Sequence, residues 1–390
     1  MKVPVTVLSG YLGSGKTTLL QQILQNEDKL KIAVIVNDMT EINIDARLIK
    51  ENGLVQTDEK LVELQNGCIC CTLREDLLLE VNNLVRQGDI DYIVIESSGI
   101  SEPIPVAQTF TYMDEELGVN LSEKCRLDTM VTVVDTAHFW SNYSTGESLL
   151  DRQQGINEDD ERDIVDLLVD QIEFANVIIL NKVDLINTKR LQTIKGFIRK
   201  LNADADIICT AHSKVDINRV LNTNLFHFEK ASQAAGWIKE LNEEHIPETD
   251  EYNISSFLFK SRKPFHPERL MYWLENWPEG IVRAKGFFWL ASRNDQVGLL
   301  SQAGSNITIS GAGEWVATYS NDEQKKLLQE DSKLSREWDV LYGDRLTEIV
   351  FIGISISQKE IQESLELCVL TEEEMTEGWL SFHDPLPDFY

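Results

Sequence analysis

The segment 10–17 constrains the fold of this chain more than any other part of its sequence. It reads Gly-Tyr-Leu-Gly-Ser-Gly-Lys-Thr and fits the pattern G-x-x-x-x-G-K-[ST]. The apolar, β-branched residues 3–10 predict a buried strand that runs into it, and residues 16–25 predict a helix that leaves it. A glycine-rich turn between a strand and a helix presents backbone N–H groups to phosphate oxygens, and the helix start adds its positive dipole end.

Further apolar runs follow the first one and alternate with helical stretches up to about residue 230. The expected strands are 31–38, 60–64, 92–99, 129–135, 176–184 and 204–211, and a helix is expected over 72–86. Continuous apolar strands separated by helices favour a parallel sheet that is covered on both faces. We therefore predict the fold class α/β, with a P-loop NTPase domain built on a mainly parallel sheet.

The pattern of elements changes after about residue 230. We predict a P-loop domain over 1–230, a linker region over 231–252, a smaller C-terminal α+β domain over 253–370 and an acidic tail over 371–390. In the smaller domain the expected order is β-α-β-β-β-α-β-α, with an antiparallel sheet and a helix over 322–335. The last 20 residues contain six acidic residues and no Lys or Arg, so we expect a solvated tail.

The charge of the chain limits its partners. Of its 390 residues 36 are Lys or Arg and 65 are Asp or Glu, so the formal net charge is −29. Such a charge repels nucleic-acid phosphates and anionic membrane surfaces, so we expect neither as a partner. No run of about 18 apolar residues and no signal-like N-terminal segment is present, and we expect a cytoplasmic protein. A bound anion must therefore be held by a local site such as 10–17.

The expected nucleotide site is centred on that loop. Its glycines let backbone N–H groups surround the β-phosphate, Lys16 supplies a charge near the β and γ oxygens, and Thr17 offers a hydroxyl to Mg²⁺. The residues expected to bind the nucleotide are Gly10, Gly13, Ser14, Gly15, Lys16, Thr17, Thr18, Asp38, Gly99, Asn181, Lys182 and Asp184.

An acid is expected near the metal ion of this site. Glu96 ends an apolar strand and is followed by Ser-Ser-Gly, which places it at the carboxyl edge of a parallel sheet, where ligands bind. We expect Glu96 to act on Mg²⁺, directly or through water, and to be catalytic together with Lys16 and Thr17. Asp38, after the second strand, is a further candidate for a switch residue near Mg²⁺.

The tetrad 181–184 indicates which base is bound. It reads Asn-Lys-Val-Asp and follows an apolar strand. The carboxylate of Asp184 can accept hydrogen bonds from guanine N1–H and N2–H, whereas adenine lacks this donor pair and would leave a buried acid unpaired. The stem of Lys182 can lie along the base. The order of P-loop, acid-ended strand and N-K-x-D predicts that the chain binds and hydrolyses GTP.

A cysteine cluster indicates a second site. Cys68, Cys70 and Cys71 lie in one loop just before the helix expected from residue 72, where thiols have lowered pKa values. Three sulfur ligands suit Zn²⁺, with Cu(I) as an alternative. Closed structural zinc sites usually have four protein ligands, so we expect an incomplete site whose metal is passed on. Cysteines without metal, buried or redox-active, are the other interpretation.

Other candidate ligands give a weaker signal. Glu41 is a tentative oxygen ligand of the sulfur site or of Mg²⁺, and Asp45 is a further candidate. The isolated cysteines are expected to be small core residues, and the scattered histidines to be structural or solvated. These cysteines are Cys125, Cys209 and Cys368.

These motifs together resemble one family. The segments GYLGSGKTT, NDMTEINID, GCICC, ESSG and NKVD are similar to those of the CobW family, P-loop GTPases related to the metallochaperones UreG and HypB. KGFFWLA and GDRLTEIVFIG resemble its C-terminal domain, and the chain is most similar to the zinc-linked YciC (ZagA) type. The chain departs from relatives in having no His-rich run and in having Val36 where some carry Glu.

The resemblance implies a GTP-hydrolysing zinc metallochaperone that transfers Zn²⁺ to client metalloproteins under zinc limitation. Within the family, delivery of cobalt or another metal, of the cobalamin or nitrile hydratase type, stays open. A nucleotide-dependent kinase or ligase and a non-catalytic metal or redox sensor stay open as well. The expected partners are GTP and a client zinc metalloprotein, and an oligomer is not excluded.

Overall fold

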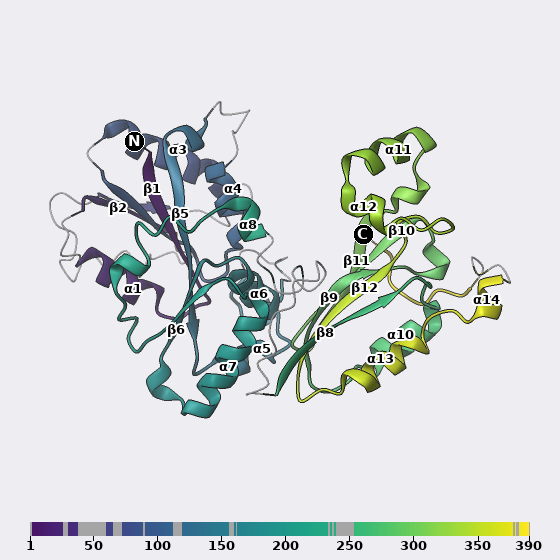
Figure 1. Ribbon diagram of the computed structural model, residues 1–390. Coiled ribbons are helices and arrows are strands. Elements are labelled where there is room, and N and C mark those ends of the chain that lie inside the picture. Colours follow the sequence, from purple (N-terminus) through teal and green to yellow (C-terminus); the bar gives the residue numbers. More distant parts are fainter. Residues whose placement is uncertain are drawn as a thin grey trace. The chain divides into compact units, whose positions relative to one another are not determined.

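The chain forms two compact units, Met1–Gly236 and Trp237–Tyr390, in a computed structural model (Figure 1). The structure describes residues 2–25, 30–37, 60–64, 72–88, 90–111, 119–155, 160, 162–232, 235, 238, 253–376, 379 and 382–389. Each unit is described by itself.

The first unit is built on a parallel sheet. Its seven strands lie in the order β3-β2-β4-β1-β5-β6-β7, and every pair of neighbours is parallel. The strands are β1 Val3–Ser9, β2 Ile32–Asn37, β3 Lys60–Leu64, β4 Tyr92–Glu96, β5 Cys125–Asp135, β6 Val177–Asn181 and β7 Asp206–Cys209. The predicted α/β class with a mainly parallel sheet is confirmed.

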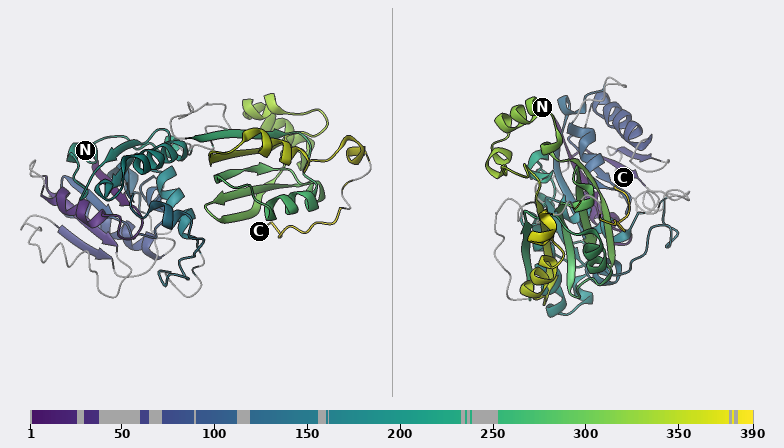
Figure 2. Two further views of the ribbon diagram at one scale, coloured as in Figure 1. Left: turned by 90° about the horizontal axis from the view of Figure 1, so that it is seen from below. Right: turned by 90° about the vertical axis from the view of Figure 1, so that its right-hand side faces the viewer.

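Helices cover both faces of this sheet (Figure 2). They are α1 Lys16–Leu24, α3 Thr72–Gln87, α4 Pro103–Thr111, α5 Phe139–Tyr143, α6 Ile164–Glu173, α7 Thr188–Leu201 and α8 Phe228–Ser232. In β1, Val7 packs towards α3 and α4, while its neighbour Leu8 packs towards α1. Because successive side chains of a strand point to opposite faces, each central strand contributes to two apolar layers. Burial on both faces explains why the strands are continuous apolar runs.

One strand is longer than its apolar run. β5 begins at Cys125 rather than at residue 129. Its first residues include polar side chains that are hydrogen-bonded within the fold. Asp128 is fully buried, and it accepts hydrogen bonds from the hydroxyls of Tyr92 (2.7 Å) and Thr129 (2.9 Å). A buried carboxylate that accepts several hydrogen bonds is stable in a strand. In the sequence, however, Asp128 interrupts the apolar run, so the sequence predicts a strand that begins after it.

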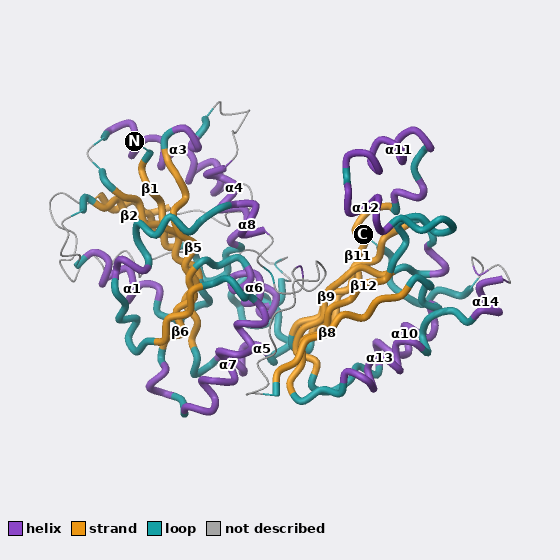
Figure 3. The backbone as a smooth tube through the Cα atoms, viewed as in Figure 1, coloured by secondary structure: helices purple, strands orange, loops and turns teal. Residues whose placement is uncertain are grey.

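The second unit contains a five-stranded antiparallel sheet, in the order β11-β10-β9-β12-β8 (Figure 3). The strands are β8 Ile254–Ser261, β9 Ile281–Phe288, β10 Gln296–Ala303, β11 Asn306–Glu314 and β12 Thr347–Ile354. The helices are α10 Pro267–Glu275, α11 Asn321–Glu330, α12 Ser332–Glu337, α13 Gln358–Glu366 and α14 Glu372–Thr376. The predicted smaller α+β domain with an antiparallel sheet is confirmed.

The helix expected over 322–335 is two helices. Asp331 separates α11 from α12, and its carboxylate accepts hydrogen bonds from the backbone N–H groups of Lys333 (2.8 Å) and Leu334 (3.0 Å). An acid that caps the first N–H groups of a helix starts a new helix rather than continuing the old one.

The prediction of a solvated tail holds for Glu372 and Glu373, which are exposed, and is wrong for the segment 384–389. The carboxylate of Asp384 accepts a hydrogen bond from Nε of Arg293 (2.8 Å), and the Arg293 guanidinium lies 4.3 Å from the ring centre of Phe389. Leu386 is 5% exposed and belongs to the apolar core of the unit. Aromatic and apolar residues between the acids attach this segment to the domain, and a count of charges does not detect them.

No helix in the part of the chain that the structure describes combines the length and the apolar character that crossing a membrane requires.

Candidate nucleotide site

The loop between β1 and α1 has a shape that only glycine allows at two positions. Gly10 and Gly15 have φ angles of 134° and 112°. A Cβ atom at Gly10 would lie 2.2 Å from the carbonyl oxygen of Val133, and one at Gly15 would lie 2.4 Å from Nδ2 of Asn181. The loop is therefore pressed against β5 and the end of β6, which leaves no room for a side chain at either glycine.

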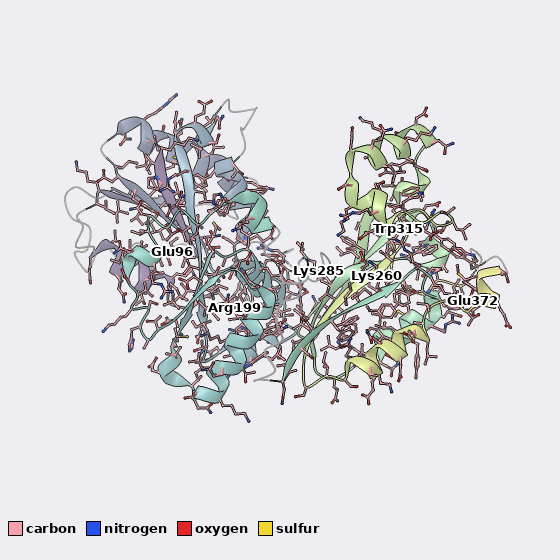
Figure 4. All side chains as sticks on the ribbon, viewed as in Figure 1. Glu96, Arg199, Lys260, Lys285, Trp315 and Glu372 are labelled. Carbon is pink, nitrogen blue, oxygen red and sulfur yellow. The ribbon has the colours of Figure 1, made fainter. Side chains whose placement is uncertain are left out.

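The polar side chains of the loop converge at the carboxyl edge of the sheet. Nζ of Lys16 donates a hydrogen bond to the carbonyl of Gly10 (2.9 Å), and the Thr17 hydroxyl donates to Oε1 of Glu96 (2.9 Å). Glu96 is 1% exposed and lies at the end of β4, between β1 and β2, as Figure 4 marks it. Three residues expected to be catalytic are thus brought together around one loop.

These donors fit a magnesium-bound nucleotide. A hydroxyl and a carboxylate at hydrogen-bond distance form the oxygen-only set that Mg²⁺ prefers. Within the described residues the Ser14 hydroxyl is buried without a hydrogen-bond partner, although it belongs to a loop whose backbone suits phosphate oxygens. A phosphate oxygen would satisfy this hydroxyl.

Asn181 ties the loop to the opposite side of the site. It is 3% exposed, and its Nδ2 donates to the carbonyl of Ser14 (2.8 Å) and to the hydroxyl of Ser213 (3.0 Å). Its Oδ1 accepts from the backbone N–H of Ser213 (2.9 Å), and the Ser213 hydroxyl in turn donates to the carbonyl of Gly15 (3.0 Å). The side chain therefore joins the phosphate loop, the end of β6 and the loop after β7.

Lys182 and Asp184 follow Asn181, the last residue of β6. Lys182 has a left-handed backbone (φ 60°), and its Nζ donates to Oδ2 of Asp135 (2.6 Å). Asp184 is exposed and makes no hydrogen bond or ion pair with other described residues. The carboxylate of Asp184 is therefore not buried by the described residues, unlike the buried acid expected from the sequence.

Two site residues were not found from the sequence. Asp135, at the end of β5, holds Lys182 and also contacts Nδ1 of His138 (2.9 Å). Burial acts to raise the pKa of Asp135, but hydrogen bonds from Lys182 and His138 outweigh it and the pKa is lowered. The second residue is Ser213. A strand-end acid was a usable signal for Asp135, but Ser213 is recognisable only through its contacts.

The remaining expected residues divide into two groups. A Cβ atom at Gly99 would lie 2.7 Å from the Leu12 side chain, so Gly99 is packed against the phosphate loop, while Gly13 and Thr18 lie on its outer side. The other residues lie outside the described residues: Asp38, Glu41, Asp45, Cys68, Cys70 and Cys71. Among the residues that are described, no group of three His, Cys, Asp or Glu side chains could hold a metal ion.

The isolated cysteines differ from one another. Cys125 and Cys368 are buried as expected, and burial raises the pKa of each thiol to about 11. Cys209 is exposed, so its prediction as a core residue is wrong. It lies on β7, an edge strand of the sheet, where Ile208 faces the core and Cys209 faces solvent.

Residues 4–209 match the family model described as "CobW/HypB/UreG, nucleotide-binding domain". The chain belongs to this family. Residues 254–369 match the model described as "Cobalamin synthesis protein cobW C-terminal domain", so the two matches fall on the two units of the structure. The resemblance predicted from the motifs is confirmed.

Curated relatives agree with this assignment. The chain is 47% identical to "Zinc-regulated GTPase metalloprotein activator 1" of Dictyostelium discoideum, over 99% of this chain and 84% of the relative. It is 34% identical to "Zinc chaperone CobW" of Pseudomonas aeruginosa, over 57% of this chain and 60% of the relative. It is 26% identical to "Zinc chaperone YjiA" of Escherichia coli, over 92% of this chain and 96% of the relative.

Proposed function

We propose that this protein, a GTPase of the CobW/HypB/UreG family, holds Zn²⁺ through Cys68, Cys70 and Cys71 and transfers it to client metalloproteins. The observation that carries the nucleotide half is the joining of the phosphate loop, Glu96 and the N-K-x-D segment at one sheet edge. The names of the curated relatives support the zinc half, and they favour zinc over cobalt as the ion.

The hydrolytic step is in-line phosphoryl transfer to water. Lys16 and the amides of 10–17 bind the β- and γ-phosphates, and their charge stabilises the transferring group. Thr17 and Glu96, the latter directly or through water, would hold Mg²⁺, which would supply positive charge against the phosphates. Glu96 also orients the attacking water, because its carboxylate is fixed by the Thr17 hydroxyl beside the loop.

Guanine selection is the role of Asp184. Its exposed carboxylate accepts hydrogen bonds from guanine N1–H and N2–H, and Lys182 lies along the base while Asp135 holds its ammonium group. Adenine lacks this N1–H and N2–H donor pair, so bound ATP would desolvate the carboxylate without satisfying it. This difference argues against an ATP-dependent kinase or ligase.

The two sites are coupled in this proposal. The cysteine segment connects β3, which ends at Leu64, with α3, which begins at Thr72, and β3 is a parallel neighbour of β2. We expect loss of the γ-phosphate to weaken the hold of the cysteine segment on the ion and to release it. GTP and GDP shift the metal equilibrium only through a difference in their contacts with the two states.

Metal analysis of anaerobically purified protein tests the proposal. We expect about one zinc per chain, its loss in a Cys68/Cys70/Cys71 triple serine variant, and unchanged GTP hydrolysis in that variant when Mg²⁺ is present and no zinc is added. A Lys16→Ala variant should show the reverse: zinc is retained and hydrolysis is lost. Full zinc occupancy in the triple serine variant would contradict the assignment of the cysteines. ATP competing as well as GTP for the site would contradict the assignment of Asp184.

A further inference from the structure

The second unit has an open groove between two helices. α10 and α13 pack on the same face of the five-stranded sheet (Figure 3). Residues of both helices line a groove of about 580 Å³. The lining includes Glu268, Arg269, Tyr272 and Trp273 of α10, Ser364 of α13 and Leu367 directly after α13. Arg269, Tyr272 and Trp273 are spaced i, i+3 and i+4, so they share one face of α10.

The groove has a fixed floor and exposed apolar edges. Trp273 is 7% exposed, and its Nε1 donates to the hydroxyl of Ser364 (2.8 Å), which ties the two helices together. Tyr272 and Leu367, on opposite edges, are 69% and 76% exposed. Large apolar side chains at this exposure beside a groove of this volume are typical of interaction sites.

The helices around the groove carry more acidic than basic residues. Glu268 itself lines the groove, and its Oε1 lies 3.3 Å from Nδ1 of His383. α10, α13 and α14 together carry eight acidic residues, and their basic residues are Arg269 and Lys359. Both are neutralised locally: the guanidinium of Arg269 pairs with Glu374 (2.7 Å) and the Lys359 ammonium pairs with Glu363 (3.7 Å). Exposed Glu366 precedes Leu367 directly, and exposed Glu275 lies one turn after Tyr272.

We propose that this groove binds an amphipathic α-helix of a partner protein, with an apolar face and Lys or Arg on either side of it. The apolar stripe takes anchors at i, i+3 and i+4 of the partner, which is the helix-in-groove mode of recognition. The acidic edges attract the basic flanks and repel an acidic helix. The same edges disfavour an anionic membrane, and the net charge of −29 disfavours a second copy of this chain. The proposal does not depend on whether the partner receives zinc.

The probe is a synthetic Leu/Lys peptide of about 15 residues, long enough to form a helix, with Leu at helical spacing. Its controls are an isomer of the same composition with alternating Leu and Lys, and a Leu/Glu helix. Binding to the full-length protein is followed by anisotropy of the labelled peptide. We expect the Leu/Lys helix to bind, and Tyr272→Ala with Leu367→Ala to weaken it at least about tenfold. A matched control, Val340→Ala with Leu341→Ala, removes side chains that are 96% and 80% exposed elsewhere in the unit, and should change the affinity less than twofold.

A second pair of variants tests the charge. Glu275→Lys with Glu366→Lys should weaken the Leu/Lys helix and reduce the salt dependence of its binding, since two attractive charges become repulsive. Equal binding of the alternating isomer, equal losses in the control pair, or unchanged binding in the Lys pair would each overturn the proposal. So would a concentration-dependent dimer in sedimentation that Leu367→Ala abolishes, because the occupant would then be a second copy. Tyr272 and Leu367 are exposed, so unfolding temperatures should not change.

Discussion

Replacement of Asn181 by Ala is expected to separate the stability of the nucleotide site from the stability of the fold around it. The side chain is 3% exposed and makes three hydrogen bonds that join Ser14 and Ser213. Each such bond contributes about 1 kcal/mol, and a buried partner left unpaired costs about 1–3 kcal/mol, so we expect a total cost of about 2–4 kcal/mol. If about 1.4 kcal/mol of this falls on the shape of the phosphate loop, nucleotide affinity drops about tenfold.

Asn202→Ala provides the matched control. Asn202 is 0% exposed, and its Nδ2 donates to the carbonyls of Ile172 (2.9 Å) and Ala175 (2.9 Å) just before β7 begins, at the opposite edge of the sheet. We expect this variant to lose a similar free energy of unfolding in urea while it binds a fluorescent GDP analogue normally.

The assay compares three quantities for both variants: the free energy of unfolding, the affinity for the GDP analogue and hydrogen exchange of the peptide that contains Ser213. Asn181→Ala should lower the free energy of unfolding and the affinity for the GDP analogue. It should also speed hydrogen exchange at Ser213, because the backbone N–H of Ser213 loses its acceptor. The reasoning is refuted if both variants bind nucleotide equally well, or if exchange at Ser213 is unchanged in Asn181→Ala.

Three further predictions concern single side chains. Asp184→Asn replaces a carboxylate, which accepts from guanine N–H groups, with an amide that also donates. In competition assays the affinity for GTP should fall at least about tenfold and that for xanthosine triphosphate should rise; a preference for GTP as strong as in the unaltered protein would contradict the role of Asp184. Gly10→Ala places a Cβ atom 2.2 Å from the carbonyl oxygen of Val133, so a titration with nucleotide should show no binding. Normal binding would contradict the described shape of the loop. The hydrogen bonds from Arg269 lower the pKa of Glu374 from 4.5 to about 2, so this pair stabilises the second unit above pH 4.5 and the contribution is lost as the pH falls towards 2. Glu374→Gln should reduce the pH dependence of the free energy of unfolding between these values, and an unchanged dependence would show that the pair does not contribute.

Much of the first unit could be predicted from the sequence because its central strands are buried on both faces. Val7 and Leu8 face different apolar layers, so the strand appears in the sequence as an uninterrupted apolar run. Such a run can be recognised without an alternation of apolar and polar residues. The phosphate loop could also be predicted, since Gly10 and Gly15 are required by local backbone geometry. The carboxylate of Glu96 follows from its place at a strand end.

The features that sequence reasoning missed depend on contacts between distant segments. Asp128 is compatible with a strand only because Tyr92 and the backbone of 223–224 donate hydrogen bonds to it. The same holds for Ser213, whose role becomes visible only through Asn181 and Gly15. Net charge likewise did not show that Arg293 attaches the acidic C-terminal segment to the second unit.

The most direct test of the central claim is the affinity for Zn²⁺, measured by competition with a chelator in the presence of a non-hydrolysable GTP analogue and then of GDP. We expect tighter binding in the GTP state, by about 5-fold to 150-fold, because a coupling of about 1–3 kcal/mol is typical of linked sites. We also expect the difference to disappear in Lys16→Ala. Identical zinc affinities in the two nucleotide states of the unaltered protein would contradict the account.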